Sequence, residues 1–242
     1  MNRMKWIIVM LAALMAVLSL MVGVYSSLQT LAWDADLYGE WSRQAVGQML
    51  NTQDEAKISA YIGMDEAQHM QVAQDISSFM RGETNMMPSV FNEKEGMHMR
   101  DVRLLIAKIE AFASKYCAAF SGLIALILCW LGTQIAHRRR WVFLGMLGGY
   151  AITAAAAALL MGTAFENLFI QMHLWLFDNE LWLMNPETDM LIRMMPLGLF
   201  ERCARHILLN AVTLGAGMMT AMYLMMDWLV GNMIRRHLTE RK

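Results

Sequence analysis

The sequence predicts an all-α membrane protein with four transmembrane helices, an extracytoplasmic helical segment and an interfacial or re-entrant hairpin. Of its 242 residues, 57% are hydrophobic and 17% are charged, whereas soluble domains average roughly 45–50% and about 25%. The mean hydropathy is +0.35. So much apolar surface needs lipid to cover it, which excludes a disordered chain and argues against an ordinary cytosolic globule.

Four apolar segments are long enough to cross a bilayer, whose hydrocarbon core requires about 20 mainly apolar residues per helix. The first has a longer apolar run than a typical signal peptide, and no A-x-A cleavage site follows it, so we expect an uncleaved anchor. We treat residues 1–242 as a single integral membrane domain. The predicted spans are residues about 6–25, 112–136, 141–162 and 206–230.

The basic residues predict how the chain is oriented in the membrane. Lysine and arginine collect before the first span, at Arg138–Arg140 between the second and third spans, and from Arg235 to the C-terminus. All three clusters lie on one side of a four-span chain, and cytoplasmic loops carry the excess of these residues. We therefore expect cytoplasmic N and C termini. The longer polar segments, about 26–111 and 163–205, then face the extracytoplasmic side.

The first outer segment has the pattern of a capped helix. Asp65 is an expected N-cap, Gln68 three residues later completes a capping box, and Gly82 provides a stop. Apolar residues recur between them at helical spacing: Val72, Ile76, Phe79 and Met80.

A second helix is expected from about His98 or Asp101 into the second span. A continuous helix from Asp101 to His137 would measure about 55 Å at 1.5 Å per residue, which exceeds the thickness of a bilayer. It must therefore tilt, kink or project outside. Lys108 and Lys115 must snorkel or face a polar cleft, because charge at membrane depth is costly.

The second outer segment favours a hairpin at the membrane interface. Pro186 and Pro196 interrupt a run of aromatic and polar residues between Phe165 and Phe200. Trp175 and Trp182 suit the interface, where amphipathic rings collect. Irregular backbone at that depth is tolerated where it lines a cavity or packs against protein.

Two histidines are the principal candidates for chemistry. His98 lies in a dense run of titratable groups, Phe-Asn-Glu-Lys-Glu-Gly-Met-His-Met-Arg-Asp-Val at 91–102, and Asp101 shares its helical face. His173 lies among aromatic residues of the second outer segment. Taken separately, the first block can be a solvated charge run and His173 an ordinary packing residue. The predicted topology places both histidines on one side, where they can converge.

Several other functions are excluded or disfavoured. A net charge of −1 shows no basic excess for nucleic acid. No H-E-x-x-H, G-x-S-x-G or glycine-rich phosphate loop occurs, which disfavours zinc proteolysis, serine hydrolysis and nucleotide binding. The three cysteines have no CxxC spacing and are expected to be buried structural thiols. We expect no cofactor and no metal site.

The two blocks together resemble the lipoprotein intramolecular transacylase (Lit) family of four-span bacterial membrane enzymes. The resemblance rests on residues 91–102 and on the Phe…His…Phe…Trp…Pro-x-Thr-Asp-x-Leu-Ile…Pro run from Phe165 to Pro196. It implies an acyltransferase of the bacterial cytoplasmic membrane whose site faces outward. Its partners would be membrane lipid and diacylglyceryl-modified lipoproteins. The sn-2 acyl chain of the S-diacylglyceryl cysteine would move to the α-amine of that cysteine and leave a lyso-form lipoprotein.

The resemblance implies that His98 and His173 are catalytic. We expect His98 to be the general base towards the amine and His173 the acid or oxyanion donor, although the two roles can be exchanged. Three acids are expected to orient His98: Glu93, Glu95 and Asp101. Five residues are candidates for positioning the substrate, although Arg100 and Arg193 also suit simple interfacial anchoring: Asn92, Arg100, Trp182, Asp189 and Arg193.

Two other classes of function remain open from the sequence. One is a non-enzymatic membrane assembly or chaperone module whose outer segment grips another protein. The other is a four-helix haem or quinone protein, which requires histidines that face each other inside the spans.

Overall fold

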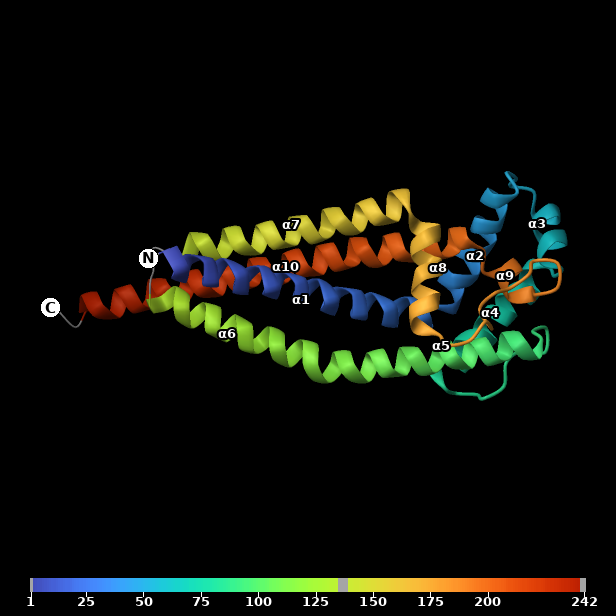
Figure 1. Cartoon of the computed structure of the whole chain (residues 1–242), viewed down its shortest axis with the longest axis horizontal. Coiled ribbons are helices and arrows are strands. Elements are labelled where there is room, and N and C mark those ends of the chain that lie inside the picture. Colours follow the sequence, from blue (N-terminus) through green and yellow to red (C-terminus); the bar gives the residue numbers. More distant parts are fainter. Residues whose placement is uncertain (1, 135–138, 240–242) are drawn as a thin grey trace. The chain divides into compact units, whose positions relative to one another are not determined.

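The computed structural model describes residues 2–134 and 139–239, and these form helices and loops without a strand (Figure 1). The predicted all-α class is confirmed. The chain divides into two compact units, which are residues 1–26, 110–158 and 207–242 (unit 1) and residues 27–109 and 159–206 (unit 2). The elements are α1 (Asn2–Trp33), α2 (Ala35–Met49), α3 (Glu55–Ile62), α4 (Glu66–Arg81), α5 (Glu93–Phe112), the π-helical turn η1 (Ala113–Cys117), α6 (Ala118–Gln134), α7 (Arg139–Thr163), α8 (Phe165–Leu176), α9 (Met190–Met194) and α10 (Leu197–Thr239).

Among the residues that the structure describes, three helices are long and apolar enough to cross a membrane, at Trp6–Leu28, Arg140–Leu159 and Leu197–Met225. They correspond to the first, third and fourth predicted spans. The second predicted span is divided between the end of α5, η1 and α6, whose apolar part, Ala119–Trp130, is shorter. The π turn interrupts the regular helical hydrogen bonding just where charged residues precede the apolar run. The count of four spans therefore stays a prediction.

Close helix packing holds unit 1 together. Gly145 and Gly149 on α7 are four residues apart and face α1. A Cβ atom at Gly145 would lie 2.9 Å from the backbone oxygen of Val9, and one at Gly149 would lie 2.8 Å from the Cα atom of Ala13. Small residues at this spacing let two membrane helices approach closely. The core beside this contact includes Ile8, Met15, Leu128 and Met146.

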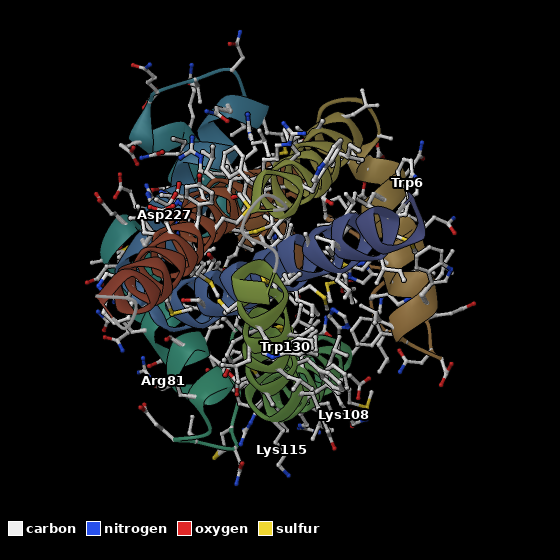
Figure 2. The ribbon with its side chains drawn as sticks, turned by 90° about the vertical axis from the view of Figure 1, so that its left-hand side faces the viewer. Trp6, Arg81, Lys108, Lys115, Trp130 and Asp227 are labelled. Carbon is white, nitrogen blue, oxygen red and sulfur yellow. The ribbon has the colours of Figure 1, made fainter. Side chains whose placement is uncertain are left out.

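Side chains on the outside of unit 1 suit contact with lipid or with the membrane surface. Trp6 and Trp130 are exposed and project from α1 and α6 (Figure 2). Lys115 in η1 is also exposed, as is Lys108 on the unit 2 part of α5. Snorkelling and a polar cleft both leave a lysine side chain exposed, so the choice between them stays a prediction.

The capped helix predicted in the first outer segment is confirmed as α4 in unit 2. The Asp65 carboxylate accepts a hydrogen bond from the backbone N–H of Gln68, and the side-chain oxygen of Gln68 accepts one from the backbone N–H of Asp65. Gly82 ends the helix with φ of 81°, in the left-handed region that glycine adopts without strain. The predicted apolar face packs into the core of unit 2 through Val72, Ile76 and Phe79.

The second outer segment consists of α8, an irregular stretch at 177–189, and α9. The five-residue α9 packs between elements of unit 2: the hydroxyl of Ser42 on α2 donates to the backbone oxygen of Met194, and the backbone N–H of Leu191 donates to Glu95 on α5. α9 therefore ties the stretch that follows α8 to the helix that carries His98. The membrane depth predicted for this hairpin stays a prediction.

Candidate functional site

His98 lies on the buried face of α5 in unit 2. It is 7% exposed, and Glu95 and Met99, which share this face, are also buried. Its Nδ1 atom is buried and has no hydrogen-bond partner among the described residues. An imidazole nitrogen buried without a partner is a cost to the fold, so this position is a candidate for a ligand or a bridging water.

His173 is the buried residue of α8, a helix whose residues the structure describes throughout. Its Nδ1 lies 2.7 Å from the backbone oxygen of Phe169, one helical turn earlier. A carbonyl oxygen can only accept, so Nδ1 carries the hydrogen of this bond. In the neutral ring, Nε2 then keeps its lone pair and is the basic nitrogen.

The two histidines lie together, as their two sequence blocks predicted. Their ring centroids are 6.0 Å apart with planes inclined by 32°. Phe177 lies 5.3 Å from the His98 ring and 5.6 Å from the His173 ring, and Trp182 lies 5.1 Å from His173. Phe169 completes the group at 4.3 Å from His173. Aromatic rings thus surround the pair and limit the access of water.

This setting favours the neutral form of His98. Burial lowers the pKa of His98 to about 4, and the neighbouring His173 adds to this effect. Asp101 raises the pKa and Lys94 lowers it, both by their charge. At neutral pH the His98 ring is therefore uncharged and can offer one N–H donor and one acceptor.

Three acids were expected to orient His98: Glu93, Glu95 and Asp101. Among the described residues, none of them forms a hydrogen bond to the His98 ring, so their orienting role stays a prediction. Asp101 accepts from the side chain of Asn179 at 3.0 Å, because its carboxylate lies a helical turn further along α5 and meets the stretch after α8. Glu95 accepts from the backbone N–H groups of Asn92 and Leu191, and Glu93 is exposed in the first turn.

Asn92 and Asp189, which were expected to position the substrate, form hydrogen bonds that connect the irregular stretch at 177–189 to the start of α5. Asp189, which is 4% exposed, accepts from the Asn92 side chain at 3.0 Å, from the Lys94 ammonium at 3.4 Å and from the backbone of Asn185 at 2.8 Å. Burial acts to raise the pKa of Asp189, but these hydrogen bonds and the charge of Lys94 hold it below its usual value. These bonds hold the stretch that contains Trp182, whose ring lies 5.1 Å from the His173 ring.

Neither arginine contacts the histidine pair among the described residues. Arg100 is exposed on α5. Arg193 on α9 lies beside Gly63 at the turn between α3 and α4, and its Nε is buried without a hydrogen-bond partner there. Trp182 is thus the one positioning candidate that the structure brings into ring contact with His173.

Sequence reasoning missed Lys94, Asn179 and Phe177 as parts of the site. Phe177 has a detectable signal, since it follows His173 by four residues and so returns to the same side of a helix. Lys94 and Asn179 bond across the chain, with partners 95 and 78 residues away, and no local pattern reports such pairs. No group of three or more metal-binding side chains gathers within 2–134 and 139–239.

The fold and site define a class: a helical membrane protein with a buried pair of histidines enclosed by aromatic rings. The sequence model of the family described as lipoprotein intramolecular transacylase Lit matches residues 7–200. The chain therefore belongs to the Lit family, and it is an enzyme of the transacylase type that the family name describes.

Solved structures with the same fold come from one membrane-integral protein. The lipoprotein intramolecular transacylase Lit from Bacillus cereus is 20% identical, with a TM-score of 0.59 over 97% of this chain and 100% of that chain. Two variants of it with a single histidine replaced have TM-scores of 0.56 and 0.58 at 20% and 19% identity. These matches cover 97% of this chain and 96% and 97% of theirs. No curated protein matches the chain by sequence.

Proposed function

We propose that this protein moves the sn-2 acyl chain of an S-diacylglyceryl cysteine to the α-amine of the same cysteine. The observation that carries the proposal is the buried pair His98 and His173, 6.0 Å apart, in a member of a lipoprotein transacylase family. One N–C bond forms, one ester C–O bond breaks, and one proton passes from the amine to the glycerol oxygen. Total mass is unchanged, and the reaction needs no acyl-enzyme.

The hydrogen bond from His173 to Phe169 supports His173 as the general base. With its Nδ1 hydrogen held by the carbonyl, Nε2 can take a proton from the attacking amine. The neutral His98 ring then suits the second role, in which an N–H stabilises the oxyanion or the departing glycerol oxygen. This is the exchanged form of the assignment preferred from sequence.

Positioning is expected to supply more of the rate than proton transfer. General acid–base help is typically worth about 10²–10⁴-fold, whereas holding the reacting groups in attack geometry can contribute about 7–11 kcal/mol. The aromatic rings around the pair are suited to this task, because they confine the substrate and exclude water that would hydrolyse the ester.

We place the reaction at the extracytoplasmic face of the bacterial cytoplasmic membrane. The clusters of lysine and arginine at both ends of the chain and at Arg138–Arg140 support cytoplasmic termini. With four spans, the residues of unit 2 that carry the histidines then lie outside, where lipid-modified lipoproteins are found. Removing one span from the count would move the C-terminus to the opposite side, so cysteine accessibility at both ends tests the topology directly.

The decisive assay is incubation of the purified protein in lipid with a diacylglyceryl lipoprotein, followed by mass spectrometry of its N-terminal peptide. An active enzyme yields a peptide of unchanged mass whose fragment ions carry one acyl chain on nitrogen. We expect His98→Gln and His173→Gln to abolish this product, while the matched variant His206→Gln retains it. Near-normal turnover in both site variants would overturn the assignment. Tight binding without acyl migration would instead favour an assembly module.

A further inference from the structure

The histidine pair is too enclosed in this conformation to meet a lipid-anchored substrate. His98 and His173 are each 7% exposed. The Phe177 ring lies 5.3 Å from the His98 ring and 5.6 Å from the His173 ring. The Trp182 ring lies 5.1 Å from that of His173. Proton transfer needs reacting groups within about 2.6–3.2 Å of an imidazole nitrogen. The rings that enclose the pair must therefore move before a substrate enters.

Phe177 and Trp182 belong to one short segment, residues 177–182, which we call the flap. It begins where α8 ends, because Phe177 is the C-cap of α8 and its φ of −127° and ψ of 128° take the chain away in an extended conformation. Phe169, the third ring beside His173, lies within α8 and is fixed there together with that histidine. The flap is therefore the part of the enclosure that can open.

The two ends of the irregular stretch at 177–189 are held differently. Asp189 anchors the far end, where it is 4% exposed and accepts the hydrogen bonds described above. Just beyond the flap, the Lys94 ammonium donates to the backbone oxygen of Leu183. Among the described residues, the flap itself has one hydrogen bond to α5, from the Asn179 side-chain amide to the Asp101 carboxylate at 3.0 Å. This bond lies at the exposed surface, where water can replace either partner.

Asn179 connects the flap to α5 through both groups of its side chain. The amide NH₂ donates to Asp101, and the amide oxygen accepts from the backbone N–H of Leu181 at 3.1 Å. The second bond shapes the turn that leads to Trp182. A hydrogen bond whose partners can also bond to water shifts an equilibrium by about two- to tenfold. That is enough to favour a closed flap and still let it open.

We propose that Asn179 is a positioning residue whose hydrogen bond to Asp101 keeps the flap closed over the histidine pair, and that the flap opens to admit the lipid anchor of the substrate. When closed, Phe177 and Trp182 exclude bulk water. The role in catalysis rests on the proposed function. With an open flap, water attacks the sn-2 ester in place of the α-amine. The ester C–O bond then breaks, the fatty acid leaves with the oxygen of the water, and the glycerol oxygen takes a proton.

The variant Asn179→Asp breaks this hydrogen bond selectively. Its carboxylate still accepts from Leu181, but it has no donor for Asp101 and repels it. The double variant Asp101→Asn with Asn179→Asp exchanges the two groups, which keeps the net charge and restores an amide-to-carboxylate hydrogen bond. Asp178→Asn is the matched control, because Asp178 is the exposed neighbour of Asn179 within the flap.

Chemical modification tests the flap without any substrate. Diethyl pyrocarbonate reacts with accessible neutral imidazoles, and mass spectrometry of peptides gives the rate at each histidine. We expect Asn179→Asp to raise the rates at His98 and His173 by about two- to tenfold. The double variant should return them to the rates of the unmodified protein, and Asp178→Asn should not change them. His69, fully buried on α4, should keep its rate in every variant. Unchanged rates at the pair, no recovery in the double variant, or an equal rise at His69 would overturn the proposal.

Product analysis tests the same hydrogen bond during turnover. A diacylglyceryl lipopeptide is incubated in lipid with each protein, and released fatty acid is compared with the N-acyl product. A residue needed only for folding would lower both products together. We expect Asn179→Asp to raise the ratio of fatty acid to N-acyl product several-fold, and the double variant to restore it. An unchanged ratio would overturn the role in excluding water. If the unmodified protein transfers no acyl chain, the proposed function fails, whereas the modification rates still decide whether Asn179 holds the flap.

Discussion

Glu95 offers the sharpest test of how the site is built. Its carboxylate is 1% exposed and accepts hydrogen bonds from two backbone N–H groups, those of Asn92 and Leu191. Asn92 directly precedes α5, and Leu191 belongs to α9, 96 residues along the chain from Glu95. Through these hydrogen bonds, Glu95 connects the stretch that contains Trp182 to the helix that contains His98.

The loss of stability on replacing Glu95 follows from these two hydrogen bonds. A hydrogen bond to a charged group contributes about 1.5–3 kcal/mol, so Glu95→Ala should lose about 3–6 kcal/mol of local stability. Glu95→Gln keeps one acceptor but sets an NH₂ donor against a backbone donor, and should lose about half as much. Total stabilities are typically about 5–15 kcal/mol, so α9 and the stretch before it should open before the rest of unit 2.

Hydrogen exchange measured by mass spectrometry checks this prediction. The peptide containing Leu191 should lose protection in Glu95→Gln, whereas the peptides of α4 should not change. Glu93→Gln is the matched control, because Glu93 lies in the same first turn but is exposed. Unchanged protection at Leu191 in Glu95→Gln would show that the hydrogen bond from Leu191 to Glu95 does not hold α9 in place. A shift in the pH profile of turnover without any loss of protection would return Glu95 to the role of orienting His98.

Three further predictions concern the histidine pair, the outer helix and the membrane bundle. The pKa of His98 is about 4 in the fold and 6.5 as its ordinary value. Between pH 6.5 and 4 the unfolded chain binds a proton at His98 that the folded protein does not, so the free energy of unfolding decreases as pH falls. His98→Gln should remove about 3 kcal/mol of this decrease, which denaturant unfolding at the two pH values measures. Burial also lowers the pKa of His69 to about 4, but His69 is present in both the unmodified protein and His98→Gln, so its effect cancels in the comparison. If the free energy of unfolding fell equally with pH in these two proteins, the reasoning would be contradicted. Asp65→Ala should cost about 1 kcal/mol in urea unfolding by removing the N-cap of α4, and no change would mean that the capping box is not formed in solution. Gly145→Ala should destabilise the detergent-solubilised protein by about 1–3 kcal/mol because its Cβ meets backbone, whereas Gly148→Ala, with no atom within 4 Å, should not; equal melting temperatures would refute the close packing of α1 and α7.

Much of the local structure of this chain could be predicted because it depends on short sequence spacing. The capping box from Asp65 to Gln68, the stop at Gly82 and three of the apolar spans are each determined within a few residues or one helix. The second span was harder, since a π turn and nearby charges divide its apolar run and no periodic pattern marks such a turn. Its crossing of the membrane stays a prediction.

The candidate site was predicted in part. The meeting of His98 and His173 could be expected once both blocks were placed on one side of the membrane, and the ring distance of 6.0 Å agrees. The partners of the acids could not be predicted. Asp101 and Asp189 share their blocks with candidate residues, but their carboxylates bond to Asn179 and to Asn92, Lys94 and Asn185 across long stretches of chain.

By itself, the amino-acid sequence determined that this is a helical membrane protein, where its apolar segments lie and which histidines are candidates, because hydropathy and helical periodicity are local properties. Only the tertiary structure decided which groups Glu95 and Asp101 bond to, and that the hydrogen bond to Phe169 leaves Nε2 of His173 as the ring nitrogen with the lone pair. A side chain's protonation and hydrogen-bond partners depend on which groups folding brings within about 3 Å, and residues far apart in the chain supply most of those groups.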